Sequence, residues 1–181
     1  MSVANLITLA RLLAAPLAIW LVLDDRMAPA FWLFVAAGLS DAVDGFIAKR
    51  FDQRSRLGAL LDPVADKVLL LSMFVTLGVA GQLPNWIVIL VVFRDILIIG
   101  GFLLASAVAH PIPTKPLFVS KLNTALQIAL VAAVLARLGL GLGEYARTVT
   151  LALVYATALT TVLSGGGYLV RWVRGSAEEG D

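Results

Sequence analysis

Long apolar runs separated by short polar breaks constrain this chain more than any other feature. A bilayer core about 30 Å thick needs roughly 20 apolar residues for each helical crossing. A mean hydropathy of +0.94 and 14% charged residues leave too little polar surface to cover a soluble globule of 181 residues. Hydropathy therefore predicts an all-α integral membrane protein that forms a bundle of six transmembrane helices. These helices are expected over residues 5–23, 29–50, 57–81, 84–109, 117–140 and 145–173.

The breaks between the apolar runs are too short to hold a second domain. Residues 1–174 are therefore expected to form one transmembrane domain, and residues 175–181 a disordered acidic C-terminal tail. Lys and Arg are concentrated in the break between the second and third runs, whereas the next break contains neither. The positive-inside rule places the basic break in the cytoplasm, and six crossings then place both termini on the same side.

The distribution of charge favours phosphate-bearing lipids over nucleic acid as partners. The net charge is +2 and the pI is near 9.2, but the basic residues lie in short groups between apolar runs. A nucleic-acid-binding protein would instead present them along one soluble face. Anionic phosphate groups at the membrane surface are the expected partners. The chain contains no cysteine, which excludes thiolate chemistry.

Four aspartates lie in the second and third apolar runs, where a charged side chain is costly. Insertion scales put that cost at about 2.5–3.5 kcal/mol at the centre of a helix. Asp41 and Asp44 project within roughly 60° of each other near the end of one predicted helix, and Asp62 and Asp66 project within roughly 40° near the start of the next. The short basic break would bring all four to one depth near the cytoplasmic face. Their mutual repulsion requires cations between them, and Mg²⁺ or Mn²⁺ suits carboxylate ligands.

Ion pairing is the alternative explanation for these acids, which would then cap the two helices at the membrane interface. For any one aspartate the two explanations are comparable. For the whole set the metal site is favoured, because small residues between the acids leave room for a ligand. The basic residues available for pairing are Lys49, Arg50, Arg54, Arg56 and Lys67.

The acids belong to a longer pattern that resembles the signature of the CDP-alcohol phosphotransferase family, D-x2-D-G-x2-A-R-x8-G-x3-D-x3-D. The resemblance covers about residues 3–135. One position departs from it, since this chain has Lys49 where the family usually has Arg, and Lys lacks the two-point fork of a guanidinium. The matching residues are Asp41, Asp44, Gly45, Ala48, Gly58, Asp62 and Asp66.

The resemblance implies a homodimeric membrane enzyme that transfers a phosphatidyl group from CDP-diacylglycerol to an alcohol acceptor lipid. It further implies a bacterial inner or mitochondrial inner membrane, with the active site on the cytoplasmic side. Two Mg²⁺ or Mn²⁺ ions would be held by the four aspartates, and Asp66 would be the catalytic general base. The residues implied to bind the CDP-lipid are Asp44, Gly45, Ala48, Lys49 and Gly58.

Two later segments favour one acceptor. Arg94-Asp95 resembles the Arg-Asp pair of CDP-alcohol-type cardiolipin synthases, and residues 120–127 resemble their Ser-Lys-x-Asn-Thr-Ala-x-Gln segment. Phosphatidylglycerol is therefore the favoured acceptor, giving cardiolipin and CMP, and glycerol 3-phosphate is the alternative. Both acceptors carry a phosphate, which Arg94 and Lys121 are expected to bind. Alternatively, Arg94 pairs internally with Asp95, and Lys121 extends to the membrane interface.

A divalent-cation transporter is the alternative from another functional class. It would also explain a buried acidic cluster in a small helical membrane protein. Its expected marks are inverted repeats, broken helices and ligands near the bilayer midplane. The sequence shows no convincing repeat, and the acids lie at helix ends beside a basic break. The enzyme is therefore favoured.

Overall fold

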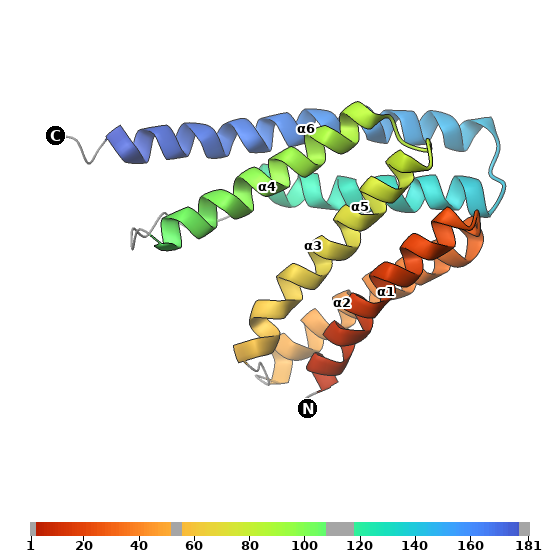
Figure 1. Ribbon diagram of the computed structural model, residues 1–181, viewed down its shortest axis with the longest axis horizontal. Helices are drawn as coiled ribbons and strands as arrows, with labels where there is room; N and C mark the ends of the chain where they lie inside the picture. The colour runs from red at the N-terminus through yellow and green to blue at the C-terminus, as the bar shows by residue number, and fades with distance from the viewer. Residues whose placement is uncertain (1–2, 52–55, 108–117, 178–181) are drawn as a thin grey trace. The chain divides into compact units, whose positions relative to one another are not determined.

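The computed structural model describes residues 3–51, 56–107 and 118–177, and within these ranges the chain forms six α-helices and no strand (Figure 1). The order of the helices follows the order of the apolar runs, which confirms the all-helical prediction. The helices are α1 (Val3–Leu23), α2 (Met27–Phe51), α3 (Arg56–Val79), α4 (Asn85–Ala107), α5 (Phe118–Gly139) and α6 (Glu144–Ala177).

The C-terminal end of α6 differs from the expectation. The helix continues to Ala177, whereas the sequence predicted an end at residue 173 and a disordered tail over 175–181. No proline lies between Val173 and Ala177, so every backbone N–H that continues the helix is present after the last apolar stretch. Residues 178–181 lie outside the described part of the chain.

Two helices in the described part of the chain are long and apolar enough to cross a membrane, over Phe118–Gly139 and Glu144–Val170. Three shorter apolar stretches lie in the first three helices, over Leu12–Leu23, Met27–Ser40 and Lys67–Val79. Helical length and composition thus agree with membrane crossing for two of the six predicted spans.

Three helices end in a left-handed residue that reverses the chain. Asp25 has a φ of 58°, Gly81 of 69° and Gly141 of 63°. After α1, the backbone N–H of Arg26 donates to the carbonyl of Leu21 at 2.8 Å, which satisfies a carbonyl that the helix leaves open. These turns lie in the polar breaks that the sequence predicted.

The chain divides into two compact units, each of which is described by itself. The first comprises residues 1–83 and 131–149, and the second residues 84–130 and 150–181. In the first unit α1 packs against both α2 and α3. The buried side chains of α1 include Ala14, Ala15 and Ala18, whose small size permits close approach of neighbouring helices.

Candidate active site

The four acidic residues lie on two consecutive helices, as the sequence predicted. Asp41 and Asp44 belong to the last turns of α2, and Asp62 and Asp66 to the first turns of α3. Helix ends joined by residues 52–55 can lie at most about 18 Å apart. Residues three or four apart share a helical face, so each pair of acids lies on one face of its helix. The side chains of all four acids lie outside the described part of the structure, so their convergence stays a prediction.

The residues expected to bind the CDP-lipid also lie on both α2 and α3. Gly45, Ala48 and Lys49 lie in α2 beyond Asp44, and Gly58 lies in the first turn of α3. Their side chains are likewise outside the described part. The acidic donor set nevertheless fits hard divalent ions, because carboxylate oxygens are their preferred protein ligands. Among the side chains that the structure does describe, no group of three His, Asp or Glu could hold a metal ion.

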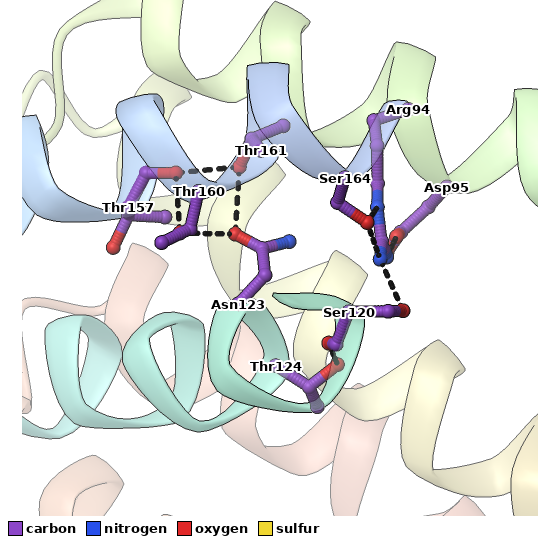
Figure 2. A network of polar contacts seen from close by, with 9 residues as sticks. All are labelled: Arg94, Asp95, Ser120, Asn123, Thr124, Thr157, Thr160, Thr161 and Ser164. Carbon is purple, nitrogen blue, oxygen red and sulfur yellow. Dashed lines mark hydrogen bonds and ion pairs between the residues drawn. The ribbon is translucent and has the colours of Figure 1, made fainter. Parts of the chain in front are cut away.

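Arg94 lies at the centre of a buried polar network in the second unit (Figure 2). Its Nη1 donates to Asp95 Oδ1 at 2.6 Å, and both side chains are less than 5% exposed. Its Nη2 donates to Ser120 Oγ at 2.6 Å and to Ser164 Oγ at 2.7 Å, and its Nε lies 3.3 Å from Ser164 Oγ. The guanidinium therefore ties α4 to the start of α5 and to α6, with an adjacent carboxylate that compensates its charge.

Lys121 follows Ser120 directly on α5 but is exposed. The structure thus places the two cations expected to bind the acceptor phosphate in different environments. Arg94 is buried among protein hydrogen-bond partners, in agreement with the internal pair that the sequence left open. Lys121 has the accessibility that binding a phosphate requires.

A second part of the network joins α5 to α6 next to Arg94. Asn123 Oδ1 lies 2.9 Å from Thr160 Oγ1 and 2.9 Å from Thr161 Oγ1 (Figure 2). The hydroxyl of Thr161 also lies 2.7 Å from the carbonyl oxygen of Thr157, one turn earlier on the same helix. All of these side chains are buried. Polar contacts of this kind fix the register of two helices that otherwise present apolar surfaces.

The sequence interpretation did not single out the α6 residues of this network. Thr157, Thr161 and Ser164 recur at intervals of four and three residues, which is the spacing of one helical face. That recurrence of hydroxyls in an apolar helix was the available signal. It was missed because hydroxyls scarcely lower hydropathy, and a helical Ser or Thr can satisfy itself on its own backbone.

Comparison with known proteins confirms the family resemblance. The sequence pattern of the family described as CDP-alcohol phosphatidyltransferase matches residues 1–163. A cardiolipin synthase (CMP-forming) of Rattus norvegicus is 34% identical, over 92% of this chain and 60% of that protein. A chloroplastic CDP-diacylglycerol–glycerol-3-phosphate 3-phosphatidyltransferase of Oryza sativa subsp. japonica is 32% identical, over 95% of this chain and 57% of that protein.

A third relative covers less of the chain at higher identity. The CDP-diacylglycerol–glycerol-3-phosphate 3-phosphatidyltransferase of Aquifex aeolicus is 39% identical over 63% of this chain and 66% of that protein. The chain spans less than two thirds of the length of the rat and rice relatives. The match over residues 1–163 includes both acid-bearing helix ends and the Arg94 network up to Thr161. The chain belongs to the CDP-alcohol phosphatidyltransferase family.

Proposed function

We propose that this chain transfers a phosphatidyl group from CDP-diacylglycerol to phosphatidylglycerol, forming cardiolipin and releasing CMP. The observation that carries the proposal is the complete acidic pattern on the adjoining ends of α2 and α3, inside the region that matches the family. Four carboxylates at that place have no role in packing apolar helices, but they provide the ligands and the base that the transfer requires.

The reaction is a direct displacement at the phosphatidyl phosphorus. The hydroxyl oxygen of the acceptor forms a bond to this phosphorus while the bond to the bridging pyrophosphate oxygen breaks, and CMP leaves with that oxygen. Asp66 takes the proton of the attacking hydroxyl as general base. No covalent enzyme intermediate is needed, which agrees with a chain that has no cysteine and one histidine.

Enzymes of this family use divalent metals, and the donor set of this chain fits them. Two Mg²⁺ or Mn²⁺ ions held by Asp41, Asp44, Asp62 and Asp66 would supply positive charge to the pyrophosphate and to the departing CMP. Gly45, Ala48 and Gly58 leave the α2 and α3 backbones open to the close approach of the CDP-lipid. Lys49 adds a single positive point charge near the phosphates of the CDP-lipid. Asp44, on the same helix, is also proposed to bind this lipid.

The two cations near the start of α5 have different proposed contributions to the acceptor phosphate. Lys121 is exposed and binds it directly. Arg94 contributes to phosphate binding indirectly, because it holds Ser120, the residue before Lys121. Ser120 Oγ accepts a hydrogen bond from Arg94 Nη2 at 2.6 Å. A direct contact of Arg94 with the phosphate would have to compete with Asp95, Ser120 and Ser164.

Glycerol 3-phosphate is the alternative acceptor, supported by the names of the rice and Aquifex relatives. Identity does not separate the two activities, since the rat cardiolipin synthase and the rice enzyme are 34% and 32% identical to this chain. The preference for phosphatidylglycerol rests on the Arg94-Asp95 pair and on the segment 120–127. The transporter alternative is disfavoured because the matched family consists of transferases.

Membrane insertion through six crossings is part of the proposal. Both units expose large apolar side chains that would be costly in water and suit contact with lipid. The proposal includes a homodimer in a bacterial or mitochondrial inner membrane, with the α2–α3 connection on the cytoplasmic side. Examples of these exposed side chains are Leu13, Trp32, Val79, Ile89, Phe93 and Phe118.

Release of CMP by the purified protein tests the function. Mixed micelles contain CDP-diacylglycerol and Mg²⁺ or Mn²⁺, with either phosphatidylglycerol or glycerol 3-phosphate as acceptor. We expect release that depends on phosphatidylglycerol, is lost in Asp66→Asn and is unchanged in the matched control Asp25→Asn. Release only with glycerol 3-phosphate would support the alternative acceptor, and no release with either acceptor and metal would refute both.

A further inference from the structure

Six polar residues follow one another along facing sides of α5 and α6 in the second unit. They recur at intervals of three and four residues on each helix, so each set lies on one face. All of them except the half-buried Ser120 are buried. We call this set the polar seam, and it consists of Ser120, Asn123 and Gln127 on α5 with Thr157, Thr161 and Ser164 on α6.

We call each helical turn at which a residue of α5 faces a residue of α6 a level of the polar seam. Hydrogen bonds fix the register of the two helices at two such levels (Figure 2). At the first level Ser120 and Ser164 accept from the same Nη2 of Arg94, at 2.6 and 2.7 Å. At the second level Asn123 Oδ1 lies 2.9 Å from Thr161 Oγ1. Residue numbers rise along α5 as they fall along α6, so the two helices run antiparallel here. One further turn along each helix brings Gln127 on α5 opposite Thr157 on α6.

The third level has polar atoms that the described part of the protein leaves without hydrogen bonds. Gln127 Oε1 and Nε2 and Thr157 Oγ1 are buried there without a partner, as is Asn123 Nδ2 at the level above. Gln127, Asn123 and Thr157 each have a side-chain exposure of 0%. Buried polar atoms in folded proteins are nearly always satisfied, by protein groups or by bound molecules. Four such atoms on two facing helices indicate that something polar binds between them.

The chemistry of these atoms identifies the class of group that would bind. The amide nitrogens of Asn123 and Gln127 donate, Gln127 Oε1 accepts, and the Thr157 hydroxyl does both. A metal ion would need acceptors only, and a phosphate would need donors only. A hydroxyl oxygen donates and accepts, and so matches the mixed set. Charge does not oppose this match, because the Arg94–Asp95 pair lies at the first level, two turns from Gln127.

We propose that the polar seam binds a hydroxyl oxygen between Gln127 and Thr157. Either an internal water or a hydroxyl of the acceptor's glycerol headgroup provides this oxygen. The second source rests on the proposed function, whereas the first does not. In both cases the bound oxygen joins α5 to α6 one level beyond the Asn123–Thr161 contact.

Thermal unfolding of the purified protein in detergent micelles tests the site without any need for turnover. Gln127→Leu and Thr157→Val remove the polar atoms with little change of volume. If the site is filled, each variant loses hydrogen bonds, and we expect its Tm to fall by about 3 °C. The Tm of the double variant should be no lower than the Tm of the less stable single variant, because both residues hold the same oxygen. Thr157→Ser keeps the hydroxyl and should retain most of the parental Tm.

Thr148→Val is the matched control, because Thr148 lies on the same helix with an exposed hydroxyl. Its Tm should stay within about 1 °C of the parent. A higher Tm for Gln127→Leu than for the parent in micelles both without and with phosphatidylglycerol would overturn the proposal: an amide that binds nothing carries only a desolvation penalty, so its removal would raise the Tm in both. Additive losses in the double variant would overturn it equally, since they would mean separate environments.

The two sources are separated by adding phosphatidylglycerol to the micelles. If the acceptor provides the hydroxyl, the site is filled only when this lipid is present, so the basal Tm does not fall in Gln127→Leu and Thr157→Val, and the rise in Tm that the lipid produces in the parent is lost in both variants. If water provides it, the basal Tm falls but the rise on adding lipid is retained. Absence of CMP release in the functional assay would refute the proposed transferase and leave the basal Tm result intact, so the two failures are distinguishable.

Discussion

Arg94 and Ser164 are 70 residues apart in the chain, yet the Ser164 hydroxyl oxygen lies 2.7 Å from Nη2 and 3.3 Å from Nε of the guanidinium. One hydroxyl thus faces both nitrogens on one edge of Arg94, while Asp95 binds Nη1. The contact anchors α4 to α6 inside the second unit. It also explains how an arginine is retained in an apolar helix without reaching solvent.

Ser164→Ala should destabilise the protein. The change removes the oxygen that faces two N–H groups of a buried cation, and hydrogen bonds to charged groups contribute about 1.5–3 kcal/mol. We expect a Tm lower by several degrees in detergent micelles. Ser164→Thr keeps the hydroxyl, so its Tm should fall less than that of Ser164→Ala. Equal decreases in Tm in the two variants would show that loss of the hydroxyl does not cause the destabilisation.

Asp95→Asn should be more damaging than Ser164→Ala. The carboxylate lies 2.6 Å from Arg94 Nη1, with both side chains at most 4% exposed. Removal of one partner of a buried ion pair leaves an uncompensated charge, at a cost of about 3–5 kcal/mol. The yield of folded protein and the Tm measure the effect, and Asp24→Asn is the control because its pair with Arg26 is exposed. A loss no greater than that of the control would contradict the structural importance of the pair.

Hydropathy predicted the six helices because crossing length and apolar composition are properties of single segments. It could not decide the environment of Arg94, since an internal pair and a phosphate contact both explain a charge in an apolar helix. Only the spatial neighbours Ser120 and Ser164 favour the internal arrangement. The side chains of Asp41, Asp44, Asp62 and Asp66 lie outside the described residues, so their proposed roles rest on spacing and family membership.

Gly139→Ala should destabilise the first unit. A Cβ at this position would lie 2.6 Å from both the nitrogen and the Cα of Ala28, and backbone cannot move aside as a flexible side chain can. Overpacking of this kind costs about 1–3 kcal/mol. Gly100→Ala is the matched control, since a Cβ there meets nothing within 4 Å and alanine favours a helix. The Tm should therefore fall in the first variant and stay level or rise in the second.

Asp25→Gly should stabilise the turn after α1. Asp25 has a φ of 58°, which L-residues adopt at a cost of about 1–2 kcal/mol and glycine adopts freely. The Asp25 side chain is exposed, and the Asp24–Arg26 pair at 2.9 Å is left in place. We expect a Tm higher by a few degrees. A decrease would mean that the carboxylate makes a contribution larger than the backbone strain.

Under the proposed function, removal of divalent metal should abolish CMP release, because the four carboxylates proposed to form one site would repel a pyrophosphate once no cation compensates them. A chelator is added to the purified protein, and activity is then titrated back with Mg²⁺ or Mn²⁺. Asp62→Asn should require about tenfold more metal for half-maximal release, since it removes one charge from the proposed ligand set. Asp25→Asn, remote in sequence from the acidic pattern, should titrate as the parent does. Full activity in the presence of chelator would refute the metal assignment, whereas equal titration of Asp62→Asn and the parent would exclude Asp62 alone from the ligands.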